Sequence, residues 1–108
     1  MLKQHTFVIA ASGTTSNAID LMGRAPCKWS IPAMTGTSLA LQEKNEAGDW
    51  VVVYDDSETA VTLTAAAAAR VKHTLPGTLH LTGEIRLVSN DTEVAARTIY
   101  AYSDSFTD

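Results

Sequence analysis

Cysteine is almost absent from this chain of 108 residues, in which Cys27 stands alone. A single thiol can form neither an intrachain disulfide nor a metal site built from several thiolates. Long apolar runs are missing too, and none approaches the ~20 residues that a membrane-spanning helix needs. We therefore expect the fold to be held together by packing. We do not expect a membrane among the partners of this chain.

Charge of either sign is scarce. Charged residues make up 19% of the chain, and eight Lys and Arg against twelve Asp and Glu leave a formal net charge of -4. Binding to a nucleic-acid backbone needs clustered cations that release counterions from the phosphates, so nucleic acid is not expected as a partner. Hydrophobic residues, at 45%, suffice for one core, and the length fits a single domain over residues 1–108.

Motifs that carry chemistry are missing as well. The histidines His5, His73 and His80 lack the close spacing of a metal site, and the acidic turn at 55–58 lacks the pattern of a calcium loop. There is no strand-elbow-helix context for a serine nucleophile and no glycine-rich phosphate loop. We expect no catalytic residue, no metal and no cofactor, and hence no enzyme.

The N-terminal segment MLKQHTFVIAA carries a Lys and a short apolar run that His5 and Thr6 interrupt. This run is too short for the apolar region of a secretory signal. We expect the segment to be part of the mature protein, with the cytoplasm as the site of synthesis.

The chain does contain many short segments in which apolar and polar residues alternate, separated by turn residues. Roughly eight such segments in one domain predict an all-β fold, a two-sheet antiparallel β-sandwich of the jelly-roll or immunoglobulin-like kind. The end of the chain, residues 104–108, is expected to be a loose tail. The candidate segments are 3–11, 18–23, 27–32, 38–55, 60–64, 78–89 and 93–103.

Three of these regions carry a more specific prediction. Residues 38–55 form the clearest hairpin, and apolar residues on both faces of its second arm, 50–54, predict a strand that is covered on both sides or lies centrally in its sheet. The alanine-rich stretch 65–71 is either one or two helical turns or an extended connection. Gly83 predicts a bulge or bend within 78–89.

The aromatic residues are the main candidates for a functional role. Trp29 and Trp50 alternate in phase with aliphatic neighbours, which favours core anchors over surfaces that stack on sugar rings. Tyr100 and Tyr102 share one face of their predicted strand with Thr98. Because tyrosine is favoured at protein interfaces, these two residues are the candidate interface.

Four pieces of the chain carry a family resemblance: AIDLMG at 18–23, the hairpin region WSIPAMTGTSLALQEKNEAGDWVVVYD at 29–55, AVTLT at 60–64, and GEIRLVSNDTEVAARTIY at 83–100. In this order they resemble a group of small structural proteins of tailed bacteriophages, over most of the chain. The sequence departs from that group at 43–48, where the family usually has Ser-x-Asp-Gly at the hairpin tip.

The resemblance implies a non-enzymatic virion component, made in the bacterial cytoplasm and assembled in many copies with other virion proteins, as a homo-oligomer. Within that class we expect a capsid-attached decoration protein or the base of a fibre or spike, because one domain without a coiled coil or repeats cannot form an extended fibre. The alternatives are a host-surface carbohydrate-binding module on the particle and a head-tail or tail adaptor.

Overall fold

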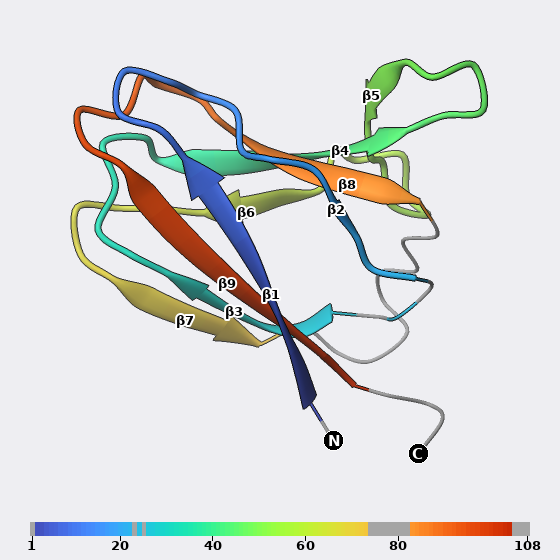
Figure 1. Ribbon diagram of the computed structural model, residues 1–108, viewed down its shortest axis with the longest axis horizontal. Coiled ribbons are helices and arrows are strands. Elements are labelled where there is room, and N and C mark those ends of the chain that lie inside the picture. Colours follow the sequence, from blue (N-terminus) through green and yellow to red (C-terminus); the bar gives the residue numbers. More distant parts are fainter. Residues whose placement is uncertain (1, 23, 25, 74–82, 105–108) are drawn as a thin grey trace.

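The computed structural model describes residues 2–22, 24, 26–73 and 83–104, and this part of the chain is all-β (Figure 1). Two antiparallel sheets face each other, which confirms the predicted β-sandwich. The strands are β1 (Leu2–Ile9), β2 (Ile19–Asp20), β3 (Pro26–Ile31), β4 (Ser38–Lys44), β5 (Trp50–Val52), β6 (Thr62–Thr64), β7 (Arg70–His73), β8 (Glu84–Ser89) and β9 (Arg97–Asp104).

The strand order decides between the two kinds of sandwich. One sheet runs β1-β9-β3-β7 and the other runs β2-β8-β4-β5, with β6 also paired to β4. The first strand thus pairs with the last, β2 with β8, β3 with β7, and β4 with β5 and β6. This inward wrapping is the order of a jelly roll in which β5 and β6 share one strand position. An immunoglobulin-like sandwich would place its first two strands side by side in one sheet.

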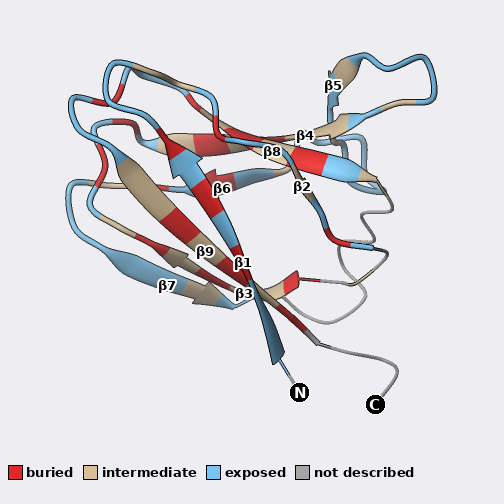
Figure 2. Ribbon diagram, in the orientation of Figure 1, coloured by how far each residue is buried: buried red, intermediate tan, exposed pale blue. Residues whose placement is uncertain are grey.

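The core fills the space between the sheets, because the longer strands β1, β3, β4, β8 and β9 turn about every second side chain inward (Figure 2). Phe7 of β1 and Trp29 of β3 meet there, with ring centroids 6.2 Å apart. Burying one large apolar side chain stabilises a fold by about 1.5–3 kcal/mol. The buried apolar residues are Phe7, Ile9, Leu21, Trp29, Ile31, Met34, Leu39, Leu41, Leu63, Ala65, Ile85, Leu87, Ile99 and Ala101.

The predicted hairpin is present, but its second arm is not central. The tip turns at Gly48, whose φ of 86° suits glycine. Among the described strands β5 pairs only with β4 and lies at an edge of its sheet. Val51 is 43% exposed, and Tyr54, just beyond the end of β5, is 62% exposed. Trp50 is half-buried and is absent from the core, so its prediction as a core anchor is wrong. The apolar residues on both faces of this arm are therefore consistent with the high β propensity of valine and aromatic side chains in an edge strand.

The alanine-rich stretch forms the extended connection rather than the helical turns. Residues 65–69 run from β6 to β7, and their backbone bonds go to the neighbouring 34–37 loop: Ala65 N–H donates to Thr37 C=O, and Met34 N–H donates to Ala66 C=O. β8 begins just after Gly83, and residues 78–82 of the predicted strand lie outside the described part. Asp104 is the last residue of β9 rather than the start of a tail, and 105–108 also lie outside it.

Four connections between the two sheets gather at one end of the sandwich, on the left in Figure 1. Backbone hydrogen bonds join them to one another and to neighbouring strands: Ser12 N–H donates to Glu93 C=O, and Glu93 N–H donates to Gly13 C=O. We call this region the crossing end. The four connections are residues 10–18, 32–37, 65–69 and 90–96.

Candidate interaction surfaces

The outward side of the sheet β1-β9-β3-β7 brings the predicted interface residues together. Residues directly opposite each other in an antiparallel pair point to the same side. Tyr100 lies in one row between Thr6 and Ser30, and Tyr102 in the next. We call this surface the tyrosine face. Its members are Gln4, Thr6, Val8, Lys28, Ser30, Val71, His73, Thr98, Tyr100 and Tyr102.

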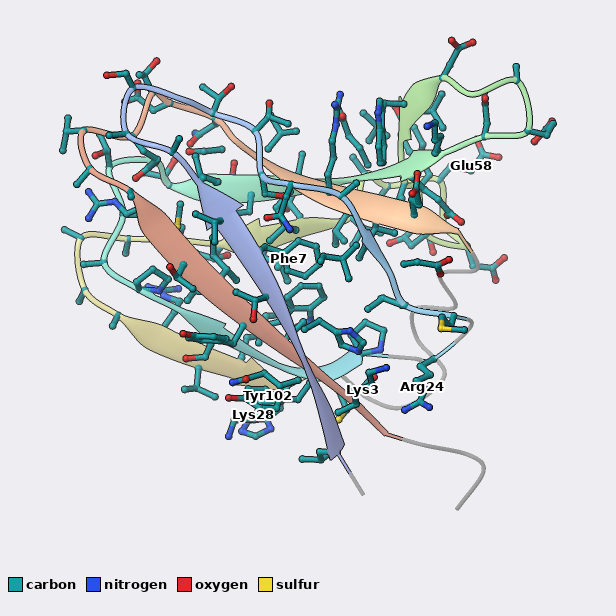
Figure 3. The ribbon with its side chains drawn as sticks, in the orientation of Figure 1. Lys3, Phe7, Arg24, Lys28, Glu58 and Tyr102 are labelled. Atoms are coloured by element: carbon teal, nitrogen blue, oxygen red, sulfur yellow. The ribbon has the colours of Figure 1, made fainter. Side chains whose placement is uncertain are left out.

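Tyr102 is held in place by its neighbours on the tyrosine face. Gln4 Nε2 donates a hydrogen bond of 2.9 Å to Tyr102 Oη. On the other side, Lys28 Nζ lies 5.1 Å from the centroid of the Tyr102 ring (Figure 3). An exposed cation–π contact contributes ~0.5–1 kcal/mol. A side chain that is already fixed loses less conformational entropy when a partner binds.

Tyr100 borders a shallow hollow of about 370 Å³ on the same face. The hollow is lined mostly by apolar and hydroxyl-bearing residues, and Val71 on its rim is 54% exposed. Arg70 is the one charged residue in its wall. The other lining residues are Ser30, Ile31, Pro32, Ala69 and Thr98.

The outward side of the sheet β2-β8-β4-β5 also carries an aromatic residue, Trp50, and we call it the tryptophan face. The Arg86 guanidinium carbon lies 4.5 Å from the centroid of the Trp50 ring, and Lys44 Nζ lies 5.8 Å from it. Arg86 Nε donates to Gln42 Oε1 at 2.8 Å, and Lys44 lies 3.6 Å from Glu84. Each of the two cations beside Trp50 therefore has a polar partner within the chain, the Gln42 amide for Arg86 and the Glu84 carboxylate for Lys44.

Sequence reasoning missed the tryptophan face because its members come from three strands. Lys44 stands opposite Trp50, and Gln42 stands opposite both Val52 and Arg86. The alternation of polar residues along β4 and β8 is visible in the sequence, but the register that aligns those strands is not.

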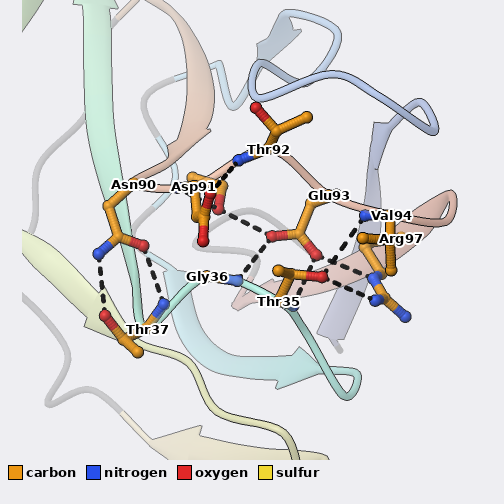
Figure 4. Close-up of polar contacts among 10 residues, drawn as sticks. Thr35, Gly36, Thr37, Asn90, Asp91, Thr92, Glu93, Val94 and Arg97 are labelled. Carbon is orange, nitrogen blue, oxygen red and sulfur yellow. Dashed lines mark hydrogen bonds and ion pairs between the residues drawn. The ribbon is translucent and has the colours of Figure 1, made fainter.

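Glu93 is a second site that the sequence did not indicate. This carboxylate is fully buried at the crossing end. It accepts hydrogen bonds of 2.9 Å from the N–H groups of Thr35 and Gly36, from Ser89 Oγ and from Arg97 Nε (Figure 4). Burial by itself raises the pKa of Glu93, but these hydrogen bonds outweigh burial and hold the pKa below its ordinary value of 4.5.

Glu93 has a structural role, in which its carboxylate joins two loops of the crossing end by hydrogen bonds. Both carboxylate oxygens are occupied, and a Cβ at Gly36 would lie 2.2 Å from Ser89 Oγ, so the loop must have glycine at this position to approach so closely. Beside it, Asn90 Oδ1 accepts from the N–H groups of Thr37 and Ser38. The cluster ties the β3–β4 crossing to the β8–β9 crossing, and the hydrogen bonds of the Glu93 carboxylate serve that connection.

The histidines are dispersed. His5 is buried, with Nε2 2.8 Å from Ser103 Oγ, whereas His73 lies on the tyrosine face and His80 is outside the described residues. Burial, and then the positive charges of Lys3 and Arg24, lower the pKa of His5 below 6.5. In the described ranges no three His, Cys, Asp or Glu side chains gather to hold a metal ion.

No helix among the described residues has the length and apolar character needed to cross a membrane. Among protein-family models, curated proteins and solved structures, none matches this chain significantly.

Proposed function

We propose that this chain is a non-enzymatic structural protein of a bacteriophage or phage-like particle, attached in many copies to other virion proteins through the tyrosine face. The composition of that face carries the proposal. It joins two tyrosines to valines, threonines, a serine, Gln4 and His73, and its described charges are Lys28 and, at the hollow, Arg70. Interface cores are enriched in tyrosine and depleted in charge in the same way.

The fold and the sequence pattern support the same proposal from other directions. Jelly rolls serve as viral capsid domains and as lectins, so the fold is compatible with a virion role without selecting it. The resemblance of 18–23, 29–55, 60–64 and 83–100 to small phage structural proteins adds the virion context. The compact unit, 38 × 32 × 24 Å, suits a capsid decoration or the base of a fibre or spike better than an extended fibre.

A carbohydrate-binding module on the particle is the second candidate, and the position of Trp50 favours it. A tryptophan on the outer face of a sandwich can stack on a sugar ring, with Gln42 and Arg86 nearby as hydrogen-bonding groups. It ranks second because Arg86 already lies over the Trp50 ring. A ligand would first have to displace this guanidinium.

The experiment that tests the proposal is the location of the chain. Particles are purified on a density gradient from the bacterial culture that produces the chain, and its peptides are quantified by mass spectrometry against the major capsid protein. We expect many copies per particle. Recovery only in the particle-free fraction would contradict the proposal.

Variants then test the face. Particles stripped of the chain are incubated with a Tyr100→Glu/Tyr102→Glu double variant, and Trp50→Ala is the matched control. We expect the double variant to lose attachment and Trp50→Ala to keep it. If host polysaccharide shifts the Trp50 fluorescence and Trp50→Ala is the variant that loses binding, the carbohydrate-binding candidate replaces the first.

A further inference from the structure

β1 forms one edge of the sheet that carries the tyrosine face. The N–H and C=O of one residue point to the same side of a strand, and the side alternates from residue to residue. Val8 N–H donates to Asn17 Oδ1 at 2.7 Å, and Asn17 Nδ2 donates to Thr6 C=O at 3.3 Å. These two bonds show that the even-numbered residues of β1, including Leu2 and Gln4, turn their backbone groups away from β9.

The Asn17 side chain therefore protects only half of this edge. It covers the stretch from Thr6 to Val8, next to the bridge between Ile9 and Ser16. The backbone groups that Leu2 and Gln4 turn outward find no partner among the described residues. An open edge of this kind is a template for a further strand.

The opposite edge of the same sheet, β7, is guarded differently. Arg70 and Lys72 alternate with its outward residues, so two β7 edges brought together would place cations close to one another. At the corresponding alternate positions, the open half of β1 has one lysine, Lys3, while its outward residues Leu2, Gln4 and Thr6 are uncharged. Self-pairing therefore brings fewer cations together at β1 than at β7.

We propose that β1 pairs antiparallel with β1 of a second copy of this chain, around a two-fold axis at Gln4. Free backbone groups meet only if even-numbered residues oppose even-numbered residues. With the axis at Gln4, Gln4 opposes Gln4 of the second copy and Leu2 opposes its Thr6. This register uses the free backbone groups of Leu2 and Gln4 and the N–H of Thr6, whose C=O also accepts from Asn17, and it leaves Val8 unpaired because Asn17 occupies its N–H. An interface of this symmetry is isologous, the commonest form of homodimer.

The pairing would join two four-stranded sheets edge to edge and place two tyrosine faces on one continuous surface. Gln4 links the edge to that surface, since its side chain donates to Tyr102 Oη. The biological role of this dimer rests on the proposed function, which the inference deepens. The pairing itself needs no virion partner. It can therefore be measured on the isolated chain.

The first test compares Gln4→Pro with Gln4→Ala by analytical ultracentrifugation over a wide concentration range. Proline removes the outward N–H at an edge position that tolerates it, whereas alanine removes only the side chain. We expect wild type and Gln4→Ala to dimerise with similar constants. Gln4→Pro should dimerise at least about tenfold more weakly, because two hydrogen bonds across the axis are lost. An unchanged far-UV circular dichroism spectrum, and a fluorescence emission of Trp29 typical of a buried indole, establish that each variant is folded.

The second test measures the register in a Cys27→Ser background. Opposed residues of a hydrogen-bonded pair lie about 5.5 Å apart between Cα atoms, within the range that a disulfide spans. Gln4→Cys should form a covalent dimer on mild oxidation. Thr6→Cys alone should not, because Thr6 opposes Leu2, whereas Leu2→Cys combined with Thr6→Cys should.

Three results would overturn the inference: a wild type that stays monomeric throughout, equal dimerisation of Gln4→Pro and Gln4→Ala, or equal cross-linking at all three positions. A monomeric wild type whose Gln4→Pro variant no longer attaches to particles would assign the edge to a strand of another virion protein and leave the proposed function standing. A dimer that is absent from particles would support the pairing of β1 and contradict the proposed function.

Discussion

The two outer faces of the sandwich both present aromatic side chains, yet they differ in what surrounds them. On the tryptophan face, Trp50 lies against Arg86 and Lys44, and each of these cations has a polar partner on a neighbouring strand. On the tyrosine face, Lys28 likewise lies over the Tyr102 ring, but Tyr100 borders an open hollow whose rim includes the exposed Val71. A half-buried aromatic residue thus indicates a docking surface only where its own chain has not already covered it.

The difference has an energetic reason. Docking onto the tryptophan face would separate groups that already contact one another, and their partners would have to be replaced. Docking onto the tyrosine face covers apolar and hydroxyl-bearing side chains around a ring that Gln4 and Lys28 already hold. The second route removes apolar surface from water at a smaller cost in desolvated charge.

The largest expected effect is on the free energy of unfolding, and it distinguishes the two tryptophans, one in the core and one on the tryptophan face. Trp29 is fully buried against Phe7, so Trp29→Ala should lower the free energy of unfolding by ~3–5 kcal/mol. Trp50→Ala at the edge should lower it by less than about 1 kcal/mol. Urea denaturation measures both values, and acrylamide should quench Trp50 much more than Trp29. Equal losses would place both tryptophans in the core.

The next effect concerns the crossing end, which joins the two faces. Glu93→Gln should lower the free energy of unfolding by ~2–3 kcal/mol, because four donors lose a charged acceptor in a buried place. Glu46→Gln, on the exposed hairpin tip, is the matched control and should change little. If the two variants have equal free energies of unfolding, the hydrogen bonds of Glu93 do not stabilise the crossing end.

The stability should also fall in two steps on acidification. The pKa of buried His5 is lowered below 6.5, so the unfolded chain binds this proton first, and stability is lost as pH falls below 6.5 toward the folded pKa. The pKa of Glu93 is lowered below 4.5, which gives a second loss as pH falls from 4.5 through its folded pKa. Urea denaturation across this range measures both steps.

Matched variants assign the two steps. His5→Gln should remove the upper step, while His73→Gln on the tyrosine face should keep it. Glu93→Gln should flatten the lower step. A profile in which His5→Gln and His73→Gln act alike would contradict the assignment of the upper step to burial.

The smallest expected effect is that of salt. Among the described side chains, the tyrosine face and its hollow carry two cations, Lys28 and Arg70, and exposed charges are screened within ~3 Å at 1 M salt. Washing particles with about 1 M NaCl should leave the chain attached. Release by salt would indicate docking through charged groups, as on the tryptophan face.

The sequence allowed the all-β sandwich and the shared face of Tyr100 and Tyr102 to be predicted, because both follow from period-two alternation along single strands. It could not distinguish a central strand from an edge strand, which depends on pairings distant in sequence, and so Trp50 was misplaced. The same limit hid Glu93, whose partners come from the 35–36 loop, Ser89 and Arg97.

The alanine-rich stretch illustrates a further limit. Residues 65–69 have high helix propensity, but the connection between β6 and β7 must pass from one sheet to the other and exchange backbone bonds with residues 34–37. Tertiary pairing therefore overrides local preference there. The jelly-roll order follows from such pairings too, which left the immunoglobulin-like alternative open at the level of the sequence.

Hydroxyl-radical footprinting of the free chain and of the chain on intact particles tests the central claim most directly, because one experiment labels both faces. Oxidation of Tyr100 and Tyr102 should fall strongly on the particle, while oxidation of Trp50 should stay as it is in the free chain. Protection of Trp50 with unchanged oxidation of the tyrosines would contradict the account and assign attachment to the tryptophan face.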